Sequence, residues 1–116
     1  MPDPVVPATG QGVVHLFWKV PAGASVETTA AVRGAVAAAR ADEVQVVPVA
    51  LLGHKADLAV MALAPDLWRL RALQTALAAT GLELVDSYVS LTELSEYAQG
   101  VPEELRQARL WPVLPP

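Results

Sequence analysis

The stretch that decides the fold is residues 46–63, which read VVPVALLGHKADLAVMAL. Two apolar runs, 46–52 and 58–63, each have the length of a strand, and the small or polar residues 53–56 separate them. Because Gly53 can adopt a positive φ, the chain can reverse direction there. The stretch therefore predicts a β-hairpin with residues 53–56 at its tip. Pro48 cannot donate a hydrogen bond to a ladder, which predicts an edge strand or a bulge.

The segment before the hairpin has the pattern of a strand followed by a helix. Residues 13–20 are rich in β-branched and aromatic side chains, which predicts a strand that ends at Pro21. Ser25 is a favourable N-cap for a helix that runs to about Ala41. The expected buried stripe of this helix consists of Val32, Val36 and Ala39.

The segment after the hairpin repeats helix and strand. Pro65 is expected in the first turn of a second helix, where its missing N–H costs nothing. Gly81 is expected to end this helix as its C′ residue, and residues 82–94 then predict a long strand. A short helix is expected at 102–109. The buried stripe of the second helix would be Leu70, Leu73 and Leu77.

The predicted order is β-α-β-β-α-β, which is typical of an α+β, ferredoxin-like fold with a four-stranded antiparallel sheet. Both helices would cover one face of that sheet. We expect an extended, poorly ordered arm at 1–11, the ferredoxin-like domain at 12–95 and a tail at 96–116.

Both faces of the predicted sheet are largely apolar. In residues 58–63, the alternation places Leu58, Val60 and Ala62 on one face and Ala59, Met61 and Leu63 on the other. Two helices can cover only one of these faces. We therefore expect the second face to need a partner, either another subunit or another domain.

The composition limits the functional classes. The chain has 116 residues, which is one domain at most, with 53% hydrophobic residues and a net charge of −4. Lysine and arginine do not cluster, which argues against a nucleic-acid partner. The chain has no cysteine, no signal-peptide pattern and no apolar run of about 18 residues that could span a membrane. A soluble cytoplasmic protein is expected.

Three stretches carry a resemblance to a known family. They are Gly53-His54-Lys55-Ala56-Asp57-Leu58, then Ser87-Tyr88-Val89-Ser90 followed by Glu93-Leu94, and finally Arg109-Leu110 with Pro112 and Pro115. In this order the chain resembles the chlorite dismutase family, which includes the coprohaem decarboxylases of haem biosynthesis. The resemblance covers about residues 12–116, and its last part is similar to that family's linker between two halves.

The resemblance implies a larger arrangement than this chain. Family members have two ferredoxin-like halves whose sheets pack together as a dimeric α/β-barrel, commonly in pentamers. Haem or coprohaem is held by the second half, which carries the proximal histidine, the distal arginine or glutamine and the catalytic tyrosine. The tail at 96–116 would be the linker to a missing second half. No catalytic, cofactor-binding or metal-binding residue is therefore assigned to this chain.

The hairpin tip carries the first candidate site. His54 and Lys55 form a cationic pair that could bind a carboxylate such as a porphyrin propionate. A structural tip is favoured instead, in which Asp57 bonds turn amides or the lysine and His54 packs on a neighbouring element.

Two ring residues are the other candidates. His15 could be a metal or haem ligand, but a lone histidine among apolar residues favours a hydrogen-bonded core residue. Tyr88, beside Asp86 and Ser90, could bind substrate, although a sheet residue facing the partner domain is favoured. A solvated acidic rim is expected from Glu93, Glu96, Glu103 and Glu104.

We therefore predict the amino-terminal, non-haem half of a coprohaem-decarboxylase-type protein. It would act as a scaffold and oligomer contact, without a cofactor of its own and without activity alone. Its partner would be the haem-binding half, on the same or a separate chain, or a second copy bound through the sheet face. Two alternatives stay open, namely a stand-alone dimeric α/β-barrel enzyme and a ligand-binding module, each using the sheet-face cavity.

Overall fold

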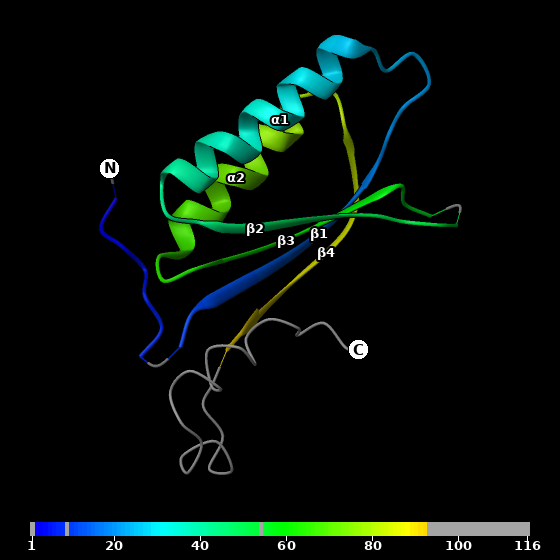
Figure 1. The fold of residues 1–116 in the computed structure, drawn as a ribbon. Coiled ribbons are helices and arrows are strands. Elements are labelled where there is room, and N and C mark those ends of the chain that lie inside the picture. The colour runs from blue at the N-terminus through cyan, green and yellow to red at the C-terminus, as the bar shows by residue number, and fades with distance from the viewer. Residues whose placement is uncertain (1, 9, 54, 93–116) are drawn as a thin grey trace.

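The fold follows the predicted order of strands and helices. The computed structural model describes residues 2–8, 10–53 and 55–92. Its elements are β1 (Gly12–Lys19), α1 (Val26–Ala41), β2 (Gln45–Ala50), β3 (Leu58–Ala64), α2 (Leu67–Ala78) and β4 (Glu83–Leu91). Both helices lie on one face of the sheet (Figure 1). The predicted helix at 102–109 and the tail at 96–116 lie outside the described residues.

The sheet is antiparallel throughout, with the strand order β2-β3-β1-β4. β2 is an edge strand, which confirms the prediction drawn from Pro48; this residue pairs with Val60 of β3. β4 forms the other edge and ends at Leu91, three residues before the predicted end at residue 94. The pairing of β1 with β4 shifts register between Phe17 and Trp18.

The hairpin between β2 and β3 is confirmed, but its loop is longer than predicted. Pairing ends at Ala50 and Leu58, so residues 51–57 form the connection and not only 53–56. Leu51 N–H donates to the carbonyl of Asp57 at 2.9 Å, which closes the loop directly beyond the last paired residues. Gly53 has a φ of 125°, which is the conformation that glycine tolerates.

The helix starts differ in one respect from the prediction. Ser25 is the N-cap of α1, as predicted. Asp66 is the N-cap of α2 and accepts a hydrogen bond from Trp68 N–H at 3.0 Å, so Pro65 lies before the cap and not in the first turn.

The end of α2 also differs from the prediction. Gly81 (φ 99°) follows the Ala79 C-cap by two residues and is therefore not the C′ residue. Neither described helix is long and apolar enough to cross a membrane.

The main core lies between the helices and the sheet, and it contains the predicted stripes. Trp18, Leu16 and Leu77 are fully buried there, and β3 contributes Val60. Val36 and Ala39 of α1 are buried, while Val32 packs against the cluster from a partly buried position. Helical spacing therefore identified the buried side of both helices, because residues three and four apart share one face.

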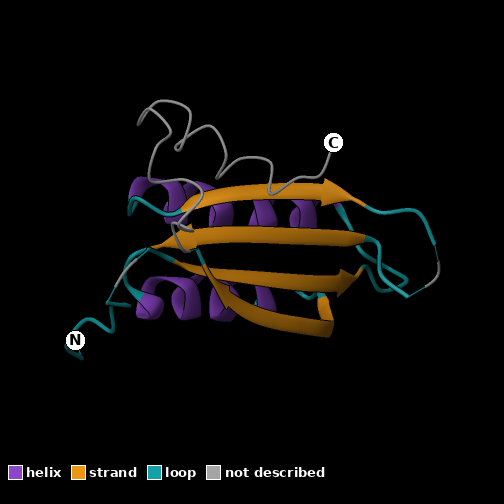
Figure 2. Cartoon of the chain, turned by 90° about the horizontal axis from the view of Figure 1, so that it is seen from below, coloured by secondary structure: helices purple, strands orange, loops and turns teal. Residues whose placement is uncertain are grey.

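The opposite side of the sheet, here called the outer face, is the side without helices (Figure 2). It is apolar, as the alternation predicted, but it is not open along its whole length. Val13, Met61 and Leu63 form a second buried cluster, with exposed fractions of 4%, 7% and 3%, and Val47 packs against it. The expected need for a partner therefore concerns the rest of this face, and it stays a prediction. The open part lies around Val49 and Tyr88, which are 44% and 53% exposed.

The amino-terminal arm has no helix or strand in its described part, but it is attached to α2. Leu67 N–H donates to the Val5 carbonyl at 2.9 Å, and Val5 N–H donates to Asp66 Oδ1 at 3.0 Å. Gln11 and Thr92 also bond to each other through backbone and side chain. The arm is thus anchored where α2 begins.

Candidate functional site

The open part of the outer face contains a small cavity beside three stacked rings. The cavity has a volume of about 230 Å³ and its lining includes Val49 and Ala59. His15 stacks on Tyr88 with ring centroids 4.2 Å apart and an angle of 15° between the planes. Phe17 lies against the same Tyr88 ring at 6.1 Å. The rings meet because β1 and β4 are paired neighbours, with His15 opposite Tyr88.

His15 is placed on the sheet but is not hydrogen-bonded as predicted. Its Nδ1 atom is buried and has no hydrogen-bond partner in the structure. Burial lowers the pKa of His15 below its usual value, because the charged imidazolium loses hydration there. The side chain is therefore a neutral ring near neutral pH, with its Nδ1 atom shielded from water. Such a ring can accept or donate one proton.

The hairpin loop brings Asp57 to the end of β1 and not to its own tip. Asp57 Oδ2 accepts a hydrogen bond from Val20 N–H at 2.8 Å, and Oδ1 lies 3.5 Å from Lys19 Nζ. The Val20 N–H, helped by Lys19, holds the pKa of Asp57 below its usual value. The carboxylate thus links two loops, which is a structural role with partners other than the predicted ones. Lys55 is exposed, and His54 lies outside the described residues.

The remaining candidates that the structure describes, Asp86 and Ser90, do not assemble into a catalytic group. Asp86 accepts a hydrogen bond from Ser87 N–H at 2.8 Å, next to it in β4. Ser90 pairs with Val13, and both Asp86 and Ser90 are exposed. The predicted acidic rim, Glu93, Glu96, Glu103 and Glu104, lies outside the described residues.

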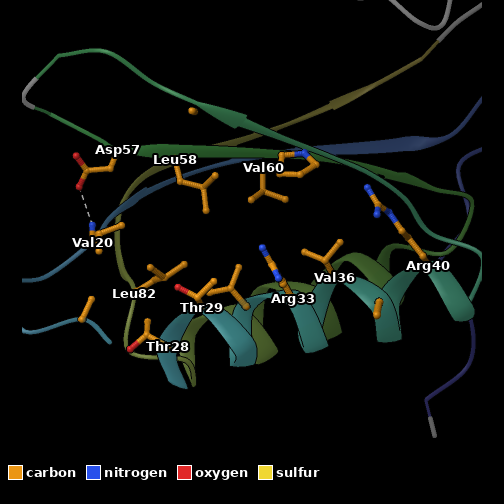
Figure 3. Close-up of a pocket in the computed structure, with 15 residues that line it drawn as sticks. Val20, Thr28, Thr29, Arg33, Val36, Arg40, Asp57, Leu58, Val60 and Leu82 are labelled. Carbon is orange, nitrogen blue, oxygen red and sulfur yellow. Dashed lines mark hydrogen bonds between the residues drawn. The ribbon is translucent and has the colours of Figure 1, made fainter. Parts of the chain in front are cut away.

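A larger cavity, here called the helix-side groove, lies between α1 and the sheet (Figure 3). Its volume is about 760 Å³. Val32 and Val36 form one wall, and Leu58, Val60 and Leu82 form the other. Pro48 and Ala50 of the edge strand and Thr28, Thr29 and Ala37 of α1 also line it.

Two arginines of α1, Arg33 and Arg40, line the same groove, and sequence reasoning missed them. Figure 3 shows the Arg33 side chain directed from α1 toward the sheet. Arg40 donates to the carbonyl of Val46 at 2.9 Å. The spacing of seven residues was a usable signal, because it places both arginines on the helix stripe that contains Val36.

Neither of these two cavities in the described part of the chain fits a haem. The outer-face cavity is smaller than the roughly 300 Å³ at which ligand pockets usually begin. The groove is large enough, but its lining contains no histidine, cysteine, methionine or tyrosine, which are the usual axial ligands. Across residues 2–8, 10–53 and 55–92, no group of three or more histidine and acidic side chains could hold a metal ion.

Comparison with a family model gives a match over most of the chain. The model described as chlorite dismutase matches residues 25–114. A comparison with curated proteins found no match.

Two solved structures are similar to this chain. One is described as a novel haem-binding protein from Thermus thermophilus, with a TM-score of 0.64 and 22% identity. The match covers 84% of this chain and 47% of that one, so this chain spans about half its length. The other is a dimeric ferredoxin-like protein of unknown function from Thermobifida fusca, with a TM-score of 0.44 and 20% identity. That match covers 79% of this chain and 99% of the other.

Proposed function

The chain belongs to the chlorite dismutase family, and from that premise we propose that it is the non-haem half of a two-part family protein. Its role is to cover the sheet of a haem-binding half and to contribute contacts within the oligomer. We infer the coprohaem decarboxylase type, in haem biosynthesis, from the hairpin and β4 residues that resemble that group. A cytoplasmic location stays a prediction.

The observation that carries this proposal is the open part of the outer face. His15, Phe17 and Tyr88 present a ring cluster beside Val49 and Ala59, and none of these side chains lies under a helix. Burial of apolar surface contributes about 25 cal/mol per Å², so a face of a few hundred Å² favours docking of another sheet. The loss of rigid-body freedom on association reduces this gain in free energy.

The length match supports the same proposal. The chain spans 47% of a haem-binding protein with a related fold. A protein twice as long would supply a second unit to pack on the outer face. In the absence of that unit, we expect two copies of this chain to pair through the same surface.

The test is the molar mass in solution at micromolar concentration, measured by light scattering during size exclusion. We expect about twice the chain mass of 12.2 kDa. Val49→Asp places a charge on the outer face and should return the mass to that of one chain. Val26→Asp, at an exposed position on α1, makes the same substitution elsewhere and should leave the mass unchanged. A monomeric wild type that takes up no hydrophobic dye would overturn the proposed docking surface.

A stand-alone enzyme or ligand-binding module is the second candidate, and one observation favours it. The outer-face cavity of about 230 Å³, which suits only a ligand much smaller than haem, has the neutral His15 ring and Tyr88 at its wall. A neutral histidine can act as a general base. The two candidates differ in genomic context, because only the first requires a neighbouring or continuous reading frame that encodes the haem half.

A further inference from the structure

The helix-side groove has the size and walls of a ligand site. Its volume of about 760 Å³ lies within the range of roughly 300–1,000 Å³ that small-molecule sites occupy. Valine and leucine side chains from α1, β3 and the start of β4 form most of its surface. Most of the lining residues are exposed, so the groove is open to solvent and a guest can enter it.

The charges that line the groove are unbalanced toward positive. Within the described part of the chain, Arg33 has no hydrogen-bond or ion-pair partner, and its side chain points toward the sheet (Figure 3). Arg40 uses one N–H group of its guanidinium to donate to the Val46 carbonyl. A guanidinium has five N–H groups, so others remain to bind a guest. Asp57 is the single acid of the lining, and Val20 N–H and Lys19 already engage it. A guest with a negative head group would therefore be favoured.

We propose that the helix-side groove binds a long-chain carboxylate, such as a fatty acid. The hydrocarbon tail lies along Val32, Leu58 and Pro48, apolar lining residues that keep exposed surface in the free chain. The carboxylate accepts charge-assisted hydrogen bonds from Arg33, with Arg40 as the second cation. The groove lies on the helix side of the sheet, so this ligand and the docking surface of the outer face do not compete.

The test uses the full 116-residue chain and two ligands that differ only in the head group. Dodecanoate, isotopically labelled at its carboxyl carbon, is titrated below its micelle concentration and followed by calorimetry and by the carboxyl resonance. Dodecanol is titrated in the same way. We expect dodecanoate to bind about tenfold more tightly, which is the size of one charge-assisted contact at a partly exposed site.

Matched variants assign that preference to the groove. Arg33→Gln should remove most of the difference between acid and alcohol, whereas Arg71→Gln removes the same charge from α2, outside the groove, and should retain it. Ala37→Phe fills the groove and should weaken both ligands. Tyr88→Ala, on the outer face, should weaken neither. Circular dichroism checks that each variant is folded, and Arg33→Met, which also removes the charge, serves as a second variant if Arg33→Gln is not.

Three outcomes would overturn the proposal. They are equal affinity for acid and alcohol (or no binding of either), an equal loss in Arg33→Gln and Arg71→Gln, and a loss in Tyr88→Ala as large as in Ala37→Phe. The oligomeric state tests the docking role by a separate measurement. A failure of ligand binding therefore leaves that role standing, and the reverse is also true.

Discussion

Asp57 holds the β2–β3 loop in place through partners that are not its neighbours in the sequence. Its oxygens reach Val20 N–H at 2.8 Å and Lys19 Nζ at 3.5 Å, both at the end of β1. Asp57 N–H also donates to the Trp18 carbonyl at 2.8 Å. The residue therefore ties the β2–β3 loop to the β1–α1 loop. The sequence placed an acid near a turn but did not identify these partners.

Removal of this carboxylate should destabilise the fold. We expect Asp57→Ala to lower the midpoint of thermal unfolding by a few degrees, because Val20 N–H loses its acceptor. Asp57→Asn keeps an acceptor oxygen and should unfold close to the wild type. Differential scanning calorimetry of the three proteins measures this. If Asp57→Ala unfolds at the wild-type temperature but loses ligand binding, a binding role for Asp57 replaces the structural one.

His15 predicts a dependence of stability on pH. Burial lowers its pKa in the folded chain, so the unfolded chain binds the proton more readily. The free energy of unfolding should be highest above the usual histidine pKa of 6.5 and should fall as the pH drops below that value. Urea denaturation between about pH 5 and 8 measures the slope, since that interval brackets the ordinary histidine pKa.

The control for this slope is the other histidine. His15→Phe should flatten the fall in stability below neutral pH, whereas His54→Gln should retain it. An unchanged slope in His15→Phe would mean that carboxylates account for the whole pH dependence.

At the scale of elements, the start of α2 joins the helix to the amino-terminal arm. Asp66 caps the helix through Trp68 N–H and also accepts a hydrogen bond from Val5 N–H, both at 3.0 Å. The leucine stripe of α2 was predictable because it depends only on helical spacing. The second partner of Asp66 was not, because it lies 61 residues away in the chain.

Loss of this cap should affect both the helix and the arm. We expect Asp66→Ala to lower the free energy of unfolding by about 1–2 kcal/mol, as for other N-caps. Limited proteolysis should also cut faster near Val5, since one of its anchors is gone. Asp66→Asn retains the cap acceptor and is the control. Equal cleavage in Asp66→Ala and the wild type would show that the backbone bond from Leu67 to Val5 anchors the arm alone.

At the scale of the whole molecule, two layers account for most of the buried surface. The helices cover one face of the sheet, and the outer face is divided into a buried part near Met61 and an open part near Tyr88. The helix-side groove and the outer-face cavity lie on opposite sides of this sheet. The outer-face cavity is too small for a haem, and the lining of the helix-side groove offers no axial ligand for the iron.

We therefore expect the isolated chain not to bind haem tightly. Addition of haem should produce no sharp Soret band that saturates at one haem per chain. The haem-binding protein from Thermus thermophilus serves as a positive control under the same conditions. A saturating band that disappears in His15→Ala or His54→Ala would contradict this expectation.

The sequence by itself determined the order and type of the described elements, the buried stripes of both helices and the apolar character of both sheet faces, and it limited Pro48 to an edge strand or a bulge. These features follow from local periodicity and from the chemistry of single residues. The tertiary structure alone decided that Asp57 bonds Val20, that His15 stacks on Tyr88, and that Arg33 lines a groove with Val60. Each of these depends on register and packing between residues far apart in the chain, and local patterns do not encode those distances.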